Sequence, residues 1–250
     1  MKYFYQKESK EILDELNTTT SGLNSKEVKK RQEKHGLNVL PEAPRPSGFQ
    51  IFLNQFKDLI VLILIAAAVI SGVTGDAESS IVIVVVLIIN AILGTTQTLN
   101  AQRSVDSLKQ LSVPKVKVIR DGVKQEIDSH HLTIGDIVEF EAGDMIVADA
   151  RIIEASSLQV QESALTGESH AVDKNTDVVE GEVVVGDQTN MVFTGSQVTY
   201  GKGQAVVTSI GVNTEIGKIS ELLNNASSGK SPLQKSIDQF SKNLSVGIII

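Results

Sequence analysis

Two long uncharged runs in the first half of the chain restrict its possible folds more than any other feature. No residue from 59 to 75 is charged and none from 79 to 102 is, and only Asp76 and Glu78 interrupt the stretch. A helix of about 20 apolar residues crosses the roughly 30 Å hydrocarbon core of a bilayer. Two buried helices in a soluble core are the alternative. A 250-residue soluble protein seldom needs two consecutive helices that are apolar on every side, so the pattern favours a membrane hairpin.

Charged residues at the ends of this hairpin predict its orientation. We expect transmembrane helices at about 57–74 and 78–99, joined by an acidic turn at Asp76. Lys57 and Arg103 flank the outer ends, and basic flanks favour the cytoplasmic side. The polar segments before and after the hairpin are therefore expected in the cytoplasm. We expect a multi-pass protein of the plasma membrane.

Composition divides the chain into four segments. Residues 1–48 form an N-terminal cytoplasmic segment, 49–102 hold the two transmembrane helices, 103–235 form the main cytoplasmic domain, and 236–250 begin a third transmembrane helix. This last segment is a basic flank followed by an apolar run of one or two helical turns. We therefore expect the chain to be the N-terminal portion of a longer protein.

The N-terminal segment carries signals for short helices. Asn24 followed by Glu27 is the pattern of a capping box, in which side chains satisfy the first free N–H groups of a helix. Gly36 is suited to end that helix, because glycine adopts the left-handed conformation at little cost.

Residues 103–235 have the pattern of an all-β domain. Asp121-Gly122 separates two alternating runs, Lys115–Arg120 and Val123–Ile127, which predicts a hairpin with a type I′ turn. The spacing of the short runs is typical of a β-sandwich or roll. Further strands are expected at 136–140, 150–153, 158–160, 190–193 and 203–208, and a helix at 215–224.

Composition also excludes several classes of function. The chain has no cysteine, which excludes disulfides, thiolate metal sites and cysteine nucleophiles. Its net charge of −7 is opposite in sign to that of most nucleic-acid-binding proteins, so we expect no nucleic-acid partner. Adjacent His130 and His131 lack the spacing of a metal site. We predict no metal site and no cofactor-binding residue in this chain.

One short motif points to chemistry. Thr166-Gly167-Glu168-Ser169 lies in a segment expected to be a loop, directly after a predicted strand. Taken alone, Glu168 is more simply interpreted as an ordinary exposed loop carboxylate.

Motifs along the whole chain resemble P-type cation-transporting ATPases, most closely the calcium pumps of the sarcoplasmic-reticulum type and their bacterial relatives. The resemblance covers residues 20–250, about the N-terminal quarter of such a pump. The motifs that carry it, in the family's order, are Gly22-Leu23, Gln55-Phe56-Lys57-Asp58, Asn90-Ala91, Gly135-Asp136-Ile137-Val138, Gly143-Asp144, Ala148-Asp149, Thr166–Ser169, Asn190-Met191-Val192-Phe193 and Thr214-Glu215-Ile216-Gly217.

The resemblance implies a fold and a role for the motif. It makes 103–235 the actuator domain, a distorted jelly roll whose loop helps to hydrolyse an aspartyl phosphate on another domain. Glu168 would accept a proton from the attacking water. Gly167 would allow close approach to the phosphate, and Thr166 and Ser169 would hold the loop in shape.

The resemblance also implies ligands and partners for a complete ATP-driven calcium pump. These are ATP, Mg²⁺, transported Ca²⁺, membrane lipid, and the phosphorylation and nucleotide domains of the same protein. The family's phosphorylated aspartate lies in Asp-Lys-Thr-Gly-Thr, a string that this chain lacks, so we expect no ATPase activity from the chain alone. Two alternatives remain: a pump for another cation (Na⁺, K⁺, H⁺ or Mn²⁺) and a standalone membrane-anchored actuator-like regulatory module.

Two positions depart from the family pattern. Val147 replaces a proline, and Gln161 replaces an aspartate ahead of Glu162-Ser163. The resemblance assigns Glu162 no contact with phosphate, so we expect its substitution by glutamine to change little.

The predicted orientation can be tested because the chain has no cysteine of its own. Single cysteines are placed at positions 30, 76 and 125 and exposed to an impermeant thiol reagent on sealed cells. We expect labelling at 76 and protection at 30 and 125, because only the hairpin turn faces outward. Labelling at 125 without labelling at 76 would contradict the hairpin.

Overall fold

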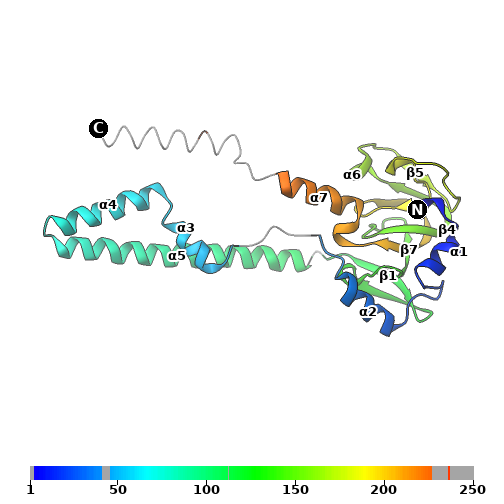
Figure 1. The fold of residues 1–250 in the computed structure, drawn as a ribbon, viewed down its shortest axis with the longest axis horizontal. Coiled ribbons are helices and arrows are strands. Elements are labelled where there is room, and N and C mark those ends of the chain that lie inside the picture. The colour runs from blue at the N-terminus through cyan, green and yellow to red at the C-terminus, as the bar shows by residue number, and fades with distance from the viewer. Residues whose placement is uncertain (1–2, 41–45, 112, 227–235, 237–250) are drawn as a thin grey trace. The chain divides into compact units, whose positions relative to one another are not determined.

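The computed structural model describes residues 3–40, 46–111, 113–226 and 236 (Figure 1). The chain divides into two compact units. A helical unit spans 43–113, and a β unit combines the chain up to residue 42 with the chain from residue 114 onward. This division differs from the predicted segments in placing the N-terminal residues with the β domain. The predicted third transmembrane helix at 236–250 lies outside the described residues, apart from residue 236.

The helical unit holds three helices whose starts are capped by side chains. Ser47 accepts a hydrogen bond from Gln50 N at 3.2 Å, and Asp58 accepts one from Ile60 N at 2.9 Å. Such caps satisfy N–H groups that have no partner within a helix. The helices are α3 (Gly48–Gln55), α4 (Leu59–Val73) and α5 (Ala77–Leu111).

Helix α5 is longer than the sequence predicted. It continues past the expected end at residue 99 and past Arg103 to Leu111. No glycine or proline interrupts the polar residues from 100 to 111, so the helix has no reason to stop before the approach to Pro114. Loss of hydropathy therefore marks the end of the apolar stretch, and not the end of the helix.

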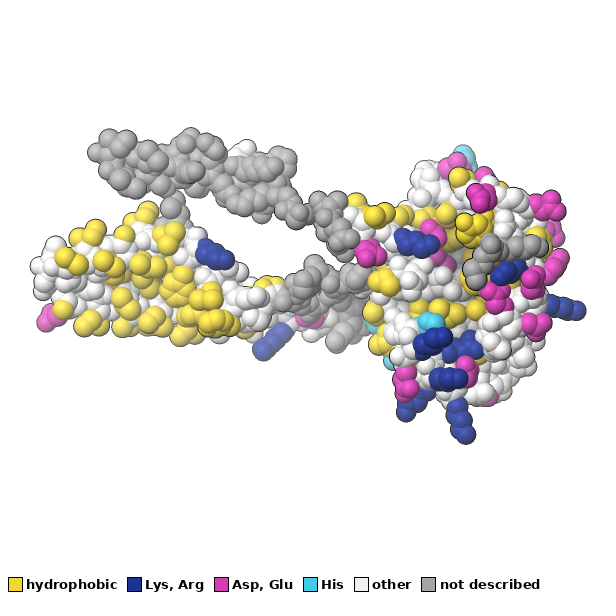
Figure 2. Space-filling view, viewed as in Figure 1, with side chains coloured by type: hydrophobic (Ala, Val, Ile, Leu, Met, Phe, Trp, Pro, Cys, Tyr) yellow, Lys and Arg dark blue, Asp and Glu magenta, His cyan; other side chains and the backbone are white. Residues whose placement is uncertain are grey.

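The apolar surface of the helical unit has the length that a membrane requires. Within Ala77–Leu108, the most apolar 18-residue window has a mean hydropathy of 2.3 and is only 11% buried. Helix α4 alone extends about 22 Å, which is less than the hydrocarbon core. Together α3 and α4 are long and apolar enough to form one membrane span, bent by 66°. Figure 2 shows hydrophobic side chains spread over this unit. The exposed hydrophobic residues of the chain include Ile60, Val69 and Val82.

The β unit is built on a seven-stranded antiparallel sheet. The strand order is β2-β1-β3-β7-β4-β5, and β6 pairs with β4 outside this path. The predicted class, a membrane-type helical hairpin with an all-β domain and short N-terminal helices, is confirmed. The strands are β1 (Lys115–Arg120), β2 (Val123–Asp128), β3 (Ile137–Glu141), β4 (Asp149–Gln161), β5 (Ala171–Lys174), β6 (Met191–Val192) and β7 (Gln197–Ser209).

The predicted hairpin is present, whereas two other predicted strands are one. Asp121 and Gly122 have φ of +50° and +74°, the signs of a type I′ turn between β1 and β2. The strands expected at 150–153 and 158–160 were wrong as separate elements, because β4 runs through both. Its pairing with β7 shifts register at several points, so the strand bends where the sequence pattern breaks.

The inward faces of these strands form the main hydrophobic core. Val118, Ile152, Leu158, Val160 and Val207 are each 0–1% exposed. They come from β1, β4 and β7, so the core joins strands that lie far apart in sequence. Helix α7 (Glu215–Ala226) follows β7 close to the range predicted for it.

The N-terminal segment packs on this sheet through buried polar side chains. Asn24 caps helix α2 (Ser25–His35) by accepting from Glu27 N at 2.9 Å, and Gly36 ends the helix at φ +79°, as predicted. From α2, Arg31 donates to the carbonyls of Leu16, Asn17 and Ile134, and so joins helix α1 (Ser9–Glu15) to the start of β3.

Asn38 fixes the end of this segment. Its Nδ2 donates to Ser129 O at 3.1 Å and Val147 O at 2.8 Å, and its Oδ1 accepts from Gly211 N at 2.9 Å. The side chain thereby joins three loops of the β unit through backbone groups alone.

We expect Asn38→Ala to lower the free energy of unfolding of the chain by about 2–3 kcal/mol. The change removes three hydrogen bonds and leaves buried backbone groups without partners. Urea unfolding of the detergent-solubilised chain, followed by far-ultraviolet circular dichroism, measures the effect. Asn213→Ala is the control: Asn213 is exposed, and its substitution is expected to change stability by less than about 0.5 kcal/mol. Equal stability of the two variants would contradict the role given to Asn38.

Candidate functional site

The Thr166–Ser169 motif lies on the connection between β4 and β5, at the side of the sheet where β5 is the last strand. A single helical turn, α6 (Ser163–Thr166), leads into it (Figure 1). Ahead of the turn Gln161 pairs with Ala171, which closes the base of the connection. The motif is therefore presented on a short loop held by two paired strands.

Hydrogen bonds from Thr166 give the loop a defined shape. Its Oγ1 donates to Glu162 O at 3.1 Å and accepts from Glu168 N at 3.2 Å. The Glu162 carbonyl also accepts from the backbone N–H groups of Leu165 and Thr166, each at 2.9 Å. Thr166 thus connects the start of the turn to the backbone of Glu168.

Gly167 ends the turn in a left-handed conformation. Its φ is +78° and its ψ is −3°, a region that costs other residues roughly 1–2 kcal/mol. A Cβ built on Gly167 would meet no atom within 4 Å. Within the described chain, the glycine is therefore required for backbone conformation and not for packing, and the space beside it is open.

Glu168 and Ser169 are exposed to solvent. The carboxylate of Glu168 projects from a loop whose preceding residues are anchored, so it is free to meet a group from outside the described chain. Gln161 Nε2 lies 3.5 Å from Ser169 O, at the limit of a hydrogen bond. The residue that departs from the family pattern at 161 thus lies next to the motif.

Beneath the loop lies a buried ion pair that the sequence analysis missed. Lys174 Nζ is 2.6 Å from Glu162 Oε1, and both side chains are 0% exposed. The signal was strand alternation: Leu158 and Val160 face the core, and the next position of that series is Glu162. Substitution of Glu162 leaves Lys174 without its countercharge, so this contact favours a loss of stability over the small effect predicted from the sequence.

The pKa values of the pair reflect its burial. Loss of hydration raises the pKa of Glu162 and lowers the pKa of Lys174, and the attraction between the two charges opposes both shifts. Lys174 also lies 5.7 Å from the centre of the Phe193 ring and donates to Gln188 O at 3.3 Å. The ammonium is thus held by a carboxylate, a carbonyl and an aromatic face.

An apolar cluster supports the loop from the side of the N-terminus. Tyr5, Met191 and Phe193 are buried together, and Leu165 of the turn packs against them. Val179 N donates to Tyr5 O at 3.0 Å, which ties the N-terminal residues to the segment after β5. Residues far apart in the sequence therefore meet next to the motif.

The other family motifs form the scaffold. Buried Asp149 accepts from Thr194 N at 2.9 Å and from Glu215 N at 2.8 Å, and burial raises its pKa. Thr214 Oγ1 accepts from Gly217 N at 3.0 Å. Two motifs distant in sequence thus meet at the start of α7 and satisfy its first N–H groups.

A second buried charge in the scaffold is also well partnered. Asp136 receives two hydrogen bonds from Arg120, at 2.9 and 2.6 Å, and one from Thr133 N at 2.9 Å. These bonds join β1 to the turn before β3, on the opposite side of the sheet from α6.

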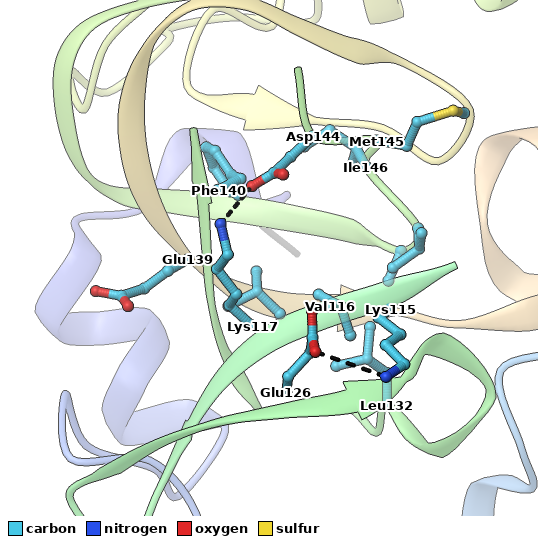
Figure 3. Close-up of a pocket in the computed structure, with 13 residues that line it drawn as sticks. Lys115, Val116, Lys117, Glu126, Leu132, Glu139, Phe140, Asp144, Met145 and Ile146 are labelled. Carbon is cyan, nitrogen blue, oxygen red and sulfur yellow. Dashed lines mark hydrogen bonds and ion pairs between the residues drawn. The ribbon is translucent and has the colours of Figure 1, made fainter. Parts of the chain in front are cut away.

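A small cavity of about 60 Å³ opens near β1 and β3, away from the motif (Figure 3). Leu132, Phe140 and Ile146 line its apolar floor, and at its rim Lys117 pairs with Asp144 at 3.4 Å. Val147 also lines it, and the carbonyl that Val147 offers to Asn38 is one that proline has too. This explains why the departure at 147 leaves the fold intact.

No metal centre accompanies these sites in the part of the chain that the structure describes. There, no three histidine, aspartate or glutamate side chains lie close enough together to hold a metal ion.

Comparisons with known proteins agree with this geometry. Residues 110–224 match the family profile of the P-type ATPase actuator domain. Residues 4–71 match the profile of the cation transporter/ATPase N-terminus. The first match contains the β sheet and the Thr166–Ser169 loop.

Curated relatives match over nearly the whole chain. A calcium-transporting ATPase of Listeria monocytogenes is 45% identical over 245 residues, covering 98% of this chain and 28% of that protein. Calcium-transporting ATPases of Lactococcus lactis and Bacillus subtilis are each 44% identical, over 96% and 97% of this chain. The chain spans 27–28% of the length of these relatives.

We expect Glu162→Gln to lower the free energy of unfolding by roughly 3 kcal/mol, because it leaves a buried ammonium without its countercharge. Glu168→Gln is the matched comparison. It changes an exposed carboxylate six residues away and is expected to alter stability by less than about 0.5 kcal/mol. Urea unfolding of both variants measures the difference. A Glu162→Gln variant as stable as the wild type would show that the pair is not closed in solution.

Proposed function

The chain belongs to the P-type ATPase family, and on that premise we propose that it supplies the actuator domain and the first membrane helices of an ATP-driven calcium pump. The names of the relatives support calcium as the transported ion, and the extent of the two profile matches supports the actuator role. The observation that carries the proposal is the exposed Thr166–Ser169 loop, held on a rigid sheet with an open space beside Gly167.

The proposed reaction is hydrolysis of an aspartyl phosphate on another domain of the pump. The oxygen of a water molecule attacks phosphorus, the bond from phosphorus to the aspartyl oxygen breaks, and the acceptor leaves as a carboxylate. The water must lose a proton as it attacks. Glu168 takes that proton as a general base, a role typically worth 10²- to 10⁴-fold in rate. Its exposure lets the carboxylate reach a phosphate presented from outside this chain.

The neighbouring residues position Glu168 for this step. Thr166 holds the backbone of Glu168 through its hydroxyl. The left-handed turn at Gly167 leaves no side chain between the loop and a crowded phosphate. Ser169 is exposed beside Glu168, and we assign it to maintaining the shape of the loop.

ATP, Mg²⁺ and Ca²⁺ are proposed as ligands of the complete pump. The family's Asp-Lys-Thr-Gly-Thr acceptor motif is not in this sequence, so phosphorylation is assigned to another part of the protein. That part, with its nucleotide domain, is the proposed partner of the Thr166–Ser169 loop.

The proposed location is the plasma membrane, in a multi-pass protein with its β unit in the cytoplasm. Support comes from the apolar helix α5, from the bent pair α3 and α4, and from basic Lys57 and Arg103 at the outer ends of the hairpin. Membrane lipid is accordingly the proposed surrounding of the helical unit.

A chimaeric pump tests the mechanism. Residues 1–250 replace the matched part of the calcium-transporting ATPase of Listeria monocytogenes, and Glu168→Gln is introduced. Because glutamine cannot accept a proton from water, we expect phosphorylation from ATP to persist and phosphoenzyme decay to slow by roughly 10²- to 10⁴-fold. Phosphoenzyme lifetime after a chase with unlabelled ATP measures this.

Glu180→Gln is the control, since Glu180 is also an exposed carboxylate and lies outside the motif. It is expected to leave decay unchanged. Decay of the Glu168→Gln phosphoenzyme at the wild-type rate would refute the role of Glu168 as a base. Loss of phosphorylation itself would show that the loop acts earlier in the cycle.

A further inference from the structure

The ion pair between Glu162 and Lys174 is fully buried, and buried ion pairs provide little net stability. Both side chains are 0% exposed, and the atoms that face each other are 2.6 Å apart. Moving two charges out of water costs about as much as their attraction returns, so apolar residues of similar volume are often equally stable. What a buried pair adds is a single preferred geometry, in some proteins at least. Its location at the base of an exposed loop indicates which geometry is held.

We propose that the Glu162–Lys174 ion pair is the positioning element of the Thr166–Ser169 loop, fixing the start of α6 against β5 and thereby the location of the Glu168 carboxylate. This inference rests on the function proposed above. Both residues are positioning residues, because neither touches a reacting group.

A short series of contacts leads from the pair to Glu168. The Glu162 carbonyl accepts from Thr166 Oγ1 at 3.1 Å, and the same oxygen of Thr166 accepts from Glu168 N at 3.2 Å. The residue whose carboxylate is fixed by Lys174 is thus the residue whose carbonyl organises the turn. Any displacement of Glu162 changes both hydrogen bonds.

The pair also closes the loop from its other end. Lys174 lies on β5, after the loop, and pairs across the sheet with Leu158 of β4. Its ammonium donates to Gln188 O at 3.3 Å and lies over the Phe193 ring. The two strands that enter and leave the loop are therefore joined by side chains as well as by backbone pairing.

The carboxylate of Glu162 depends on this one contact. Among the residues that the structure describes, neither of its oxygens receives a hydrogen bond, and its ion-pair partner is the Lys174 ammonium. Asp136, by contrast, is held by a backbone N–H in addition to Arg120. In the described chain, Glu162 has no such backbone bond. If Lys174 is lost, no other charged or hydrogen-bonding partner in that part of the chain holds the Glu162 carboxylate, so the ion pair sets the location of this side chain.

A double substitution separates positioning from stability. Glu162→Met with Lys174→Met replaces the pair by two apolar side chains of similar length, so the fold can stay packed without a directional contact. In the detergent-solubilised chain we expect a urea midpoint near that of the wild type. We expect the amides of residues 165–169 to exchange hydrogen at least about tenfold faster. Exchange is measured well below each midpoint, so that global unfolding does not contribute.

Two further variants complete the comparison. Lys174→Arg keeps an ion pair and is expected to keep slow exchange in the loop. Lys117→Met with Glu141→Met is the control. It removes a partly exposed ion pair on the far side of the sheet, in which the charged atoms are 2.5 Å apart. We expect it to leave hydrogen exchange in the loop unchanged. Wild-type exchange at residues 165–169 in the Glu162/Lys174 double variant would overturn the inference.

The chimaeric pump distinguishes this inference from the proposed function. With the Met pair we expect phosphorylation to persist and phosphoenzyme decay to slow by roughly 10- to 100-fold, the effect of a misplaced reacting group. Slow decay in Glu168→Gln with wild-type decay in the Met pair would overturn the positioning role alone. Wild-type decay in Glu168→Gln would overturn the proposed function, while loop exchange would still decide whether the pair positions the loop.

Discussion

The pairing of β4 with β7 is the constraint on which the rest of the β unit depends. Both strands have 13 residues and lie inside the sheet, so each also carries a second neighbour: β3 beside β7, and β5 and β6 beside β4. The register shifts along this pair bend the strands and allow one continuous element to serve several parts of the core. Asp149 at the first residue of β4 holds the start of α7, and Glu162, directly after its last residue, begins the turn that carries Thr166.

Two buried charges in the β unit differ in what stabilises them: backbone carbonyls in one case, and a single side chain of opposite charge in the other. Arg151 is 0% exposed and donates to four backbone carbonyls, and burial lowers its pKa to about 10, so it remains charged near neutral pH. Backbone carbonyls cannot leave without unfolding, so this support is permanent. Glu162 has a side-chain partner in Lys174, and that contact can be lost while the strands stay paired. Of these two buried charges, the one under the exposed motif therefore has the less redundant support.

Much of the fold followed from local patterns in the sequence. Asp121-Gly122 predicted the hairpin turn and Asn24 the helix cap, because each depends on residues close in sequence. The continuity of β4 was missed, since bulges break the alternation that marks a strand. At the candidate site, the motif itself was found, but its support was not. Lys174, Phe193 and Tyr5 approach the loop from separate parts of the chain, and only tertiary contacts bring them together. Strand alternation at Glu162 was the one available signal.

The length of β4 gives the β unit a mechanical property. Thirteen extended residues span at most about 40 Å, a length that the bends in β4 shorten, with the anchor of α7 at one end and the Thr166 turn at the other. A body of this kind behaves as a lever: a tilt of about 10° at the anchored end moves the far end by at most about 7 Å over such a span. Hydrogen-bonded strands in a packed sheet resist stretching. A small change in the direction of α7 would therefore displace the Thr166–Ser169 loop, while the sheet between them keeps its shape.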